Sequence, residues 1–88
     1  MMYKVEISEK ALKNLKQLDK SIARMLLIWI EKHLEGTINP RIHGKGLSHD
    51  KKGIWRYRVG NFRILANIED NRLVILLIEF GHRKDIYK

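Results

Sequence analysis

The stretch that decides the fold is IWRYRVGNFRILANIE, residues Ile54 to Glu69. Bulky apolar residues alternate with arginines on both sides of the pair Gly60-Asn61. Alternation with a period of two predicts β-strand, and a Gly-Asn pair between two such runs predicts a two-residue hairpin loop. A loop of that length puts Val59 opposite Phe62, and this one pair fixes the register of the whole hairpin.

The register sorts the side chains onto two faces, because residues directly opposite each other share a face. Arg58 lies opposite Arg63 and Arg56 lies opposite Leu65, so three arginines are predicted on one face. The other face is predicted to join the core through Trp55, Tyr57, Val59, Phe62, Ile64, Ala66 and Ile68. Neighbouring guanidinium groups repel one another, and folding alone does not explain why they gather. A polyanion is therefore the expected partner, with a solvated basic face as the alternative.

The composition indicates one small basic domain, residues 1–88, with a net charge of +8. Residues 41–88 contribute +6 of this charge, which favours nucleic acid or an acidic protein as partner. The chain contains no cysteine. Disulfides and thiolate metal sites are therefore excluded, and a reducing cytoplasm is expected. Charges throughout residues 1–20 and the short apolar run at 25–30 predict neither a signal peptide nor a membrane span.

The first half of the chain predicts a strand followed by a helical hairpin. Residues 2–7 alternate as a strand does, and Ser8 is a good N-cap for a first helix. Ser21 or Asp19 can cap a second helix that ends near Gly36. This second helix has an apolar surface wider than one stripe, which leaves part of it for a partner or a second layer.

The second half adds a loop and a third long strand. Residues 41–53 contain three glycines and four lysine or arginine residues, and are predicted to be a mobile loop anchored by Leu47. The nearly all-apolar run at 73–80 predicts an interior strand. The fold class is α+β: a small twisted, mostly antiparallel sheet on an N-terminal helical hairpin, in the order β-α-α-β-β-β.

The hairpin register, continued into the last strand, predicts which residues adjoin the arginines. Leu73, Ile75 and Leu77 fall on the core face. An apolar strip is predicted beside the arginine cluster, made of Leu65, Val74, Leu76 and Ile78.

The residues after the last strand extend the charged face. If the tail folds back, Arg83 and Lys84 join the arginines, whose planar forks suit phosphate. Tyr87 can stack on a base or tether the tail, and His82 can exchange protons or simply occupy a turn. The loop lysines Lys45, Lys51 and Lys52 either attract an anionic ligand or keep the chain soluble. Four histidines without metal-binding spacing make a weak metal site.

The motifs WRYRVGNFRIL (55–65) and GHRKDIY (81–87), in this order of elements, resemble the RelE/ParE superfamily of toxins, and the RelE branch most of all. The resemblance covers almost the whole chain. It implies a RelB-like antitoxin that covers the site, with operator DNA bound only through the toxin–antitoxin complex. It also implies cleavage of mRNA in the ribosomal A site by attack of the 2′-hydroxyl on the adjacent phosphate, without a metal or other cofactor.

The resemblance assigns the reaction to Arg56, Arg58, Arg63, Arg83 and Tyr87. RelE-type proteins have lysines at the first two of these positions, and an arginine cannot act as a general base. The base is then Tyr87 or His82, unless orientation of the 2′-hydroxyl supplies the rate. Two alternatives stay open: a ParE-like inhibitor of DNA gyrase, and a catalytically silent relative that acts as an antitoxin partner.

Overall fold

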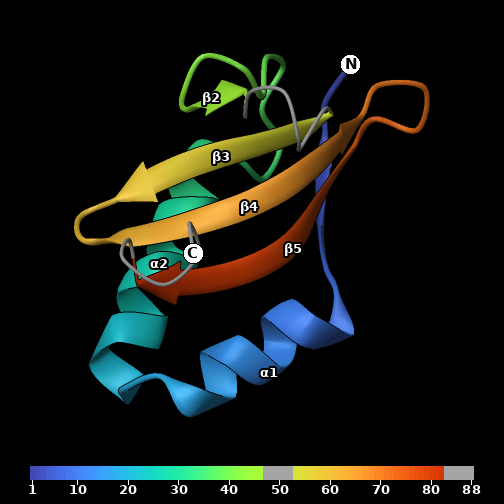
Figure 1. Ribbon diagram of the computed structural model, residues 1–88. Helices are drawn as coiled ribbons and strands as arrows, with labels where there is room; N and C mark the ends of the chain where they lie inside the picture. Colours follow the sequence, from blue (N-terminus) through green and yellow to red (C-terminus); the bar gives the residue numbers. More distant parts are fainter. Residues whose placement is uncertain (47–52, 83–88) are drawn as a thin grey trace.

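The computed structural model describes residues 1–46 and 53–82. Two helices, α1 (Glu9–Gln17) and α2 (Lys20–His33), pack on one sheet. Its strands are β1 (Lys4–Ile7), β2 (Lys45–Gly46), β3 (Ile54–Val59), β4 (Phe62–Glu69) and β5 (Val74–His82). The strand order is β1-β5-β4-β3-β2, with β1 parallel to β5 and the other pairs antiparallel. The predicted α+β class is confirmed. Figure 1 shows α2 behind the sheet and α1 alongside β5.

The β3–β4 hairpin has the predicted register. Val59 pairs with Phe62 and Arg58 with Arg63, so Gly60-Asn61 is the two-residue loop. Gly60 has a φ of 61°, a left-handed conformation that glycine adopts without the steric penalty of a Cβ atom. The loop geometry therefore determines which residues of both strands face the core.

Local capping explains where the helices begin and end. The Ser8 hydroxyl accepts a hydrogen bond from the Ala11 amide at 3.1 Å, as predicted for the start of α1. Asp19, rather than Ser21, is the N-cap of α2. Gly36 has a φ of 78° and lies two residues beyond the C-cap of α2, where its left-handed conformation turns the chain away from the helix.

The hydrophobic core lies between α2, α1 and one face of the sheet. Its sheet residues on β3 and β4 include Tyr57, Ile64 and Ala66, all fully buried, as the hairpin register predicts. Trp55, Phe62 and Ile68 pack against this core and are partly buried. The described helices are too short to cross a membrane.

A β-bulge in β5 was not predicted. Ala66 pairs with Leu77 but Leu65 pairs with Glu79, so Ile78 is an extra residue in β5. The extra residue turns Phe80 into the core, where it is 3% exposed, although simple alternation would have placed Glu79 there. Three contacts from α1 and its N-cap hold the bulge: Ser8 Oγ donates to Ile78 O at 3.0 Å, Asn14 Oδ1 accepts from Phe80 N at 3.0 Å, and Lys10 pairs with Glu79 at 3.1 Å.

Two further predictions are corrected. The segment predicted as a loop at 41–53 contains the short strand β2, which pairs with β3. The strand predicted to begin at Leu73 begins at Val74, because Leu73 has a φ of 54° and belongs to the preceding turn. Leu73 still packs against the core, as predicted. The anchor predicted at Leu47 lies outside the described residues.

Candidate nucleic-acid interface

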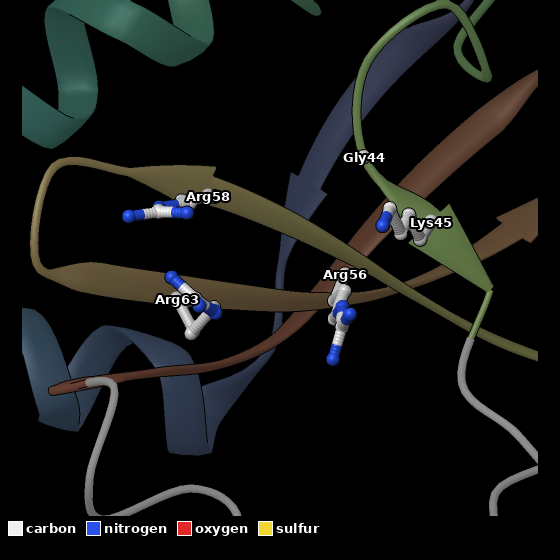
Figure 2. Close-up of a pocket in the computed structure, with 5 residues that line it drawn as sticks. All are labelled: Gly44, Lys45, Arg56, Arg58 and Arg63. Carbon is white, nitrogen blue, oxygen red and sulfur yellow. The ribbon is translucent and has the colours of Figure 1, made fainter.

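The three hairpin arginines line a hollow on the face of the sheet opposite α2. The hollow has a volume of about 260 Å³ and is lined by Gly44, Lys45, Arg56, Arg58 and Arg63. Figure 2 shows Arg58 and Arg63 side by side near the hairpin turn, with Arg56 farther along β3 and Lys45 on the neighbouring strand β2. The sheet register brings together the arginines that sequence analysis placed on one face.

Two rows of paired residues make up this charged face. Lys45, Arg56, Leu65 and Glu79 pair in turn across β2, β3, β4 and β5, and Arg58, Arg63 and Gly81 pair across β3, β4 and β5. Gly81 reaches its row because of the bulge at Ile78. The side of Arg63 that faces β5 thus adjoins a residue without a side chain.

The arginines differ in their exposure to solvent. Arg63 is only 8% exposed, Arg56 is half-buried and Arg58 is exposed. A guanidinium group keeps its charge in all three settings, since its proton is not lost under ordinary conditions. The hollow therefore combines one charge held close to the sheet with two that are open to a ligand.

Lys45 joins the hollow through a close approach of backbones. Lys45 pairs with Arg56 on β3. The preceding residue, Gly44, has a φ of 83°, and a Cβ atom there would lie 2.1 Å from the Arg56 carbonyl oxygen. Trp55 Nε1 donates to the His43 carbonyl oxygen at 2.8 Å. Glycine at position 44 is thus what allows the chain to lie against β3.

A buried tyrosine anchors the segment that leads to Lys45. The hydroxyl of Tyr57, a fully buried residue, donates to the Pro40 carbonyl oxygen at 2.6 Å. Burial raises the pKa of Tyr57 well above its usual range, so the hydroxyl stays a hydrogen-bond donor. Trp29 of α2 packs against both Tyr57 and His43. Its ring centroid lies 5.7 Å from that of Tyr57 and 5.8 Å from that of His43. These contacts fix residues 40–44 over the end of α2.

The structure does not bring His82 together with the arginines. His82 pairs with Phe62, whose side chain packs against the core, and the two rings lie 5.5 Å apart in an edge-on arrangement. The bulge is the reason, because it shifts the alternation of β5 by one residue, so that Gly81 pairs with Arg63 and His82 pairs with Phe62. This position does not support the predicted role of His82 as general base for the arginine face.

The predicted apolar strip lies on the same face as the arginines but is partly covered. Leu65 and Val74 are buried, at 8% and 4% exposure, whereas Leu76 and Ile78 are half-buried. The remaining predicted site residues fall outside the described part of the chain. These are Lys51, Lys52, Arg83, Lys84 and Tyr87.

Comparison with known proteins supports the superfamily predicted from the two motifs. The family model described as ParE toxin of type II toxin-antitoxin system, parDE, matches residues 5–87. The chain belongs to this toxin family. Comparison with curated protein sequences gives no match.

Solved structures of related toxins have the same fold. The toxin is 25% identical to a chain of the RelBE2 toxin–antitoxin complex from Mycobacterium tuberculosis, with a TM-score of 0.85 over 97% of this chain and 95% of that chain. It is also 25% identical to a chain of the archaeal RelE–RelB complex from Pyrococcus horikoshii. The TM-score is 0.71 over 97% of this chain and 99% of that chain. A variant of Escherichia coli RelE in which two arginines are replaced by alanine is 20% identical to this chain. The TM-score is 0.76 over 99% of this chain and 90% of that chain. The protein is thus a RelE-like toxin of a type II toxin–antitoxin system.

Sequence analysis missed how Gly44 and Lys45 contribute to the site. It assigned Lys45 to electrostatic attraction of RNA from a mobile loop, and it interpreted the glycines as markers of flexibility. A glycine beside a basic residue also permits close approach of two backbones. The sequence carried that signal, but it did not identify β3 as the strand approached.

Proposed function

We propose that this toxin is a ribosome-dependent endoribonuclease that cleaves translated mRNA in the ribosomal A site. The observation that carries the proposal is the convergence of Arg56, Arg58 and Arg63 on one hollow of the sheet. Three permanent positive charges at one place on a strongly basic domain suit a phosphodiester better than a neutral ligand. The protein acts in the cytoplasm, where translating ribosomes are found.

The proposed reaction needs charge stabilisation above all. The 2′-hydroxyl attacks the adjacent phosphate, and the pentavalent phosphorus carries more negative charge than the ground state. Arg63, which is held close to the sheet, and Arg58 beside it would stabilise this charge, while Arg56 would hold the adjoining phosphate or ribose. Arg83 and Tyr87, after β5, would complete the binding of the nucleotide, and Lys51, Lys52 and Lys84 would contact ribosomal RNA.

We also propose that an antitoxin encoded beside the toxin neutralises it. The related structures from Mycobacterium tuberculosis and Pyrococcus horikoshii are RelBE and RelE–RelB complexes. By analogy, a RelB-like antitoxin would cover the arginine face and use the neighbouring apolar strip, and only this complex would bind operator DNA. Coexpression of that antitoxin is expected to restore growth of cells that produce the toxin.

A second function has one observation in its favour. The matching family model is that of ParE toxins, and inhibition of DNA gyrase is the alternative function. In that case the basic face would contact a protein target and mRNA would stay intact. The arginine-lined hollow favours the nuclease, because binding to a protein does not require three guanidinium groups around one concavity.

Mapping of mRNA ends after a short pulse of toxin expression distinguishes the two functions. The nuclease predicts new 5′ ends within translated codons, and it predicts that Arg63→Ala loses at least about 100-fold in cleavage, as is common when a group that stabilises transition-state charge is removed. The matched control is Arg24→Ala, which removes an exposed arginine from α2. This variant is expected to cleave like the wild type.

The opposite results are equally informative. Intact mRNA together with an induced DNA-damage response would support gyrase inhibition instead. Cleavage by Arg63→Ala at the wild-type rate would remove the hollow from the reaction, even if the protein proved to be a nuclease.

A further inference from the structure

The described residues around the hollow pose a problem of proton transfer. Attack by the 2′-hydroxyl releases a proton, and three of the lining side chains are arginines, which cannot accept one. Gly44 has no side chain. Lys45 is the one remaining described residue that lines the hollow, and a lysine amine accepts a proton whenever it is in its neutral form.

We propose that Lys45 is the general base that takes the proton from the attacking 2′-hydroxyl. This inference rests on the proposed nuclease function and names a catalytic residue for it. In the RelE pattern the basic residues of the first hairpin strand are lysines. Here those positions are Arg56 and Arg58, and the adjacent strand β2 supplies a lysine instead.

The position of Lys45 is built into the fold. Lys45 is paired with Arg56 in the sheet register, so the two side chains share the arginine face. The hydrogen bond from Trp55 to His43 and the close approach at Gly44 hold the backbone just before it. Lys45 is exposed, which leaves its amine accessible to an RNA substrate and to solvent.

Two other described groups that could accept a proton are less suitable. Glu79 ends the same row of residues, but Leu65 separates it from Arg56 and its carboxylate pairs with Lys10 at 3.1 Å. His82 lies against Phe62 on the core side. Lys45 is therefore the best-placed proton acceptor in the described part of the chain.

The proposed step balances in atoms and charge. Neutral Lys45 takes the 2′-hydroxyl proton and becomes an ammonium ion while the 2′-oxygen bonds to phosphorus. The bond from phosphorus to the 5′-oxygen breaks, and that oxygen leaves on the downstream fragment and takes a proton from water. The products are a 2′,3′-cyclic phosphate and a 5′-hydroxyl, and Lys45 returns its proton to solvent.

Lys45→Arg is the decisive variant, because it keeps the positive charge and removes the amine that can accept a proton. Single-turnover cleavage would be measured on ribosomes stalled on a defined mRNA, over a range of pH. The charged groups that line the hollow with Lys45 are Arg56 and Arg58 from β3 and Arg63 from β4, and an arginine side chain does not accept a proton. The wild-type rate is expected to rise with pH, because only a neutral amine accepts a proton.

Lys45→Arg is expected to cleave at least about 100-fold more slowly, within the usual contribution of general acid–base catalysis. Its rate should also lose the rise with pH, while ribosome binding stays at the wild-type level. Lys45→Ala gives an independent measurement. Added ethylamine should restore its cleavage in proportion to the concentration of the neutral amine, and should leave Lys45→Arg unchanged.

The results separate this inference from the function on which it rests. Cleavage by Lys45→Arg at the wild-type rate with an unchanged pH profile would show that Lys45 supplies only charge, and would overturn its role as base while leaving the nuclease intact. Failure of ethylamine to restore Lys45→Ala would also count against that role. If the wild type cleaves no mRNA, both proposals fail together.

Discussion

Asp70 shows how one side chain joins three distant parts of the chain. Both of its carboxylate oxygens accept from the Arg41 guanidinium at 2.9 Å, and Oδ1 also accepts from the Tyr3 hydroxyl at 2.6 Å. Arg41 lies in the segment that leads to β2, Tyr3 precedes β1, and Asp70 is in the turn between β4 and β5. The same contact thus holds the approach to the site against the far end of the sheet.

This arrangement makes the stability of the toxin depend on acid pH. The Arg41 guanidinium and, after it, the Tyr3 hydroxyl lower the pKa of Asp70 from 3.8 to about 2. A carboxyl group whose pKa is lowered in the folded state stabilises the fold fully at a pH above its ordinary pKa. This stabilisation is lost as the pH falls towards the pKa of the folded state. Asp70→Asn is therefore expected to lower the urea midpoint at neutral pH, with a difference from wild type that shrinks between pH 4 and pH 2.

The control for this prediction is Glu31→Gln, which neutralises an exposed carboxylate on α2. Its urea midpoint should follow the wild-type dependence on pH. An Asp70→Asn variant that stays less stable than wild type by a constant amount down to pH 2 would mean that the charge of Asp70 is not what matters.

At the scale of elements, β2 is the shortest strand in the described part of the chain, yet it contributes a side chain to the site. It contains only Lys45 and Gly46, and it carries a basic side chain to the edge of the arginine cluster. Its position depends on Gly44, which needs both a left-handed backbone and the space beside the Arg56 carbonyl. A second glycine, Gly53, needs the left-handed backbone but not the space. Its φ is 87°, and a Cβ atom there would meet nothing within 4 Å.

These two glycines allow a matched comparison. Gly44→Ala and Gly53→Ala both force alanine into a left-handed conformation, at a cost of about 1–3 kcal/mol each. Only Gly44→Ala adds a clash that pushes β2 away from β3. We expect Gly44→Ala to slow mRNA cleavage at least about tenfold, and Gly53→Ala to leave the rate nearly unchanged. Chemical unfolding and single-turnover cleavage measure the two effects separately, and equal rates in both variants would contradict a positioning role for β2.

The hairpin and the bulge show what sequence patterns can and cannot predict. Gly60-Asn61 fixes the register of β3 and β4 locally, so the faces of Arg56, Arg58 and Arg63 follow from alternation alone. The run LVILLIEF at 73–80 is apolar at nearly every position, so it contains no alternation that would reveal an extra residue at Ile78. The bulge instead depends on tertiary contacts with α1, through Ser8, Lys10 and Asn14.

The same reasoning explains the part of the site that was missed. A two-residue strand such as β2 is too short to give a periodic signal. Its pairing with β3 comes from contacts made far away in sequence, such as the hydrogen bonds from Tyr57 to Pro40 and from Trp55 to His43. Charge gave Lys45 a role in binding RNA, whereas only the sheet placed it beside Arg56.

At the scale of the whole molecule, the two faces of the sheet have different surroundings. Figure 1 shows α2 behind one face, while the opposite face is not covered by a helix. That face carries the arginine cluster and the apolar strip, of which Leu76 and Ile78 keep partial exposure. A protein that covers the arginines can bury these side chains as well, so charge and apolar contact favour one docking face for the antitoxin.

The outer surface of α2 is the competing site, since Ile28 is 59% exposed and Leu27 is 42% exposed. Replacing one apolar residue on each surface with alanine decides whether the antitoxin binds the arginine face or α2. We expect Leu76→Ala to weaken binding of the antitoxin encoded beside the toxin at least about tenfold, or ~1.4 kcal/mol, through lost apolar contact at the centre of the interface. Ile28→Ala should change the affinity less than about twofold, because α2 lies behind the sheet. Calorimetric titration of both variants measures this, and the reverse order of effects would move the antitoxin from the arginine face to α2.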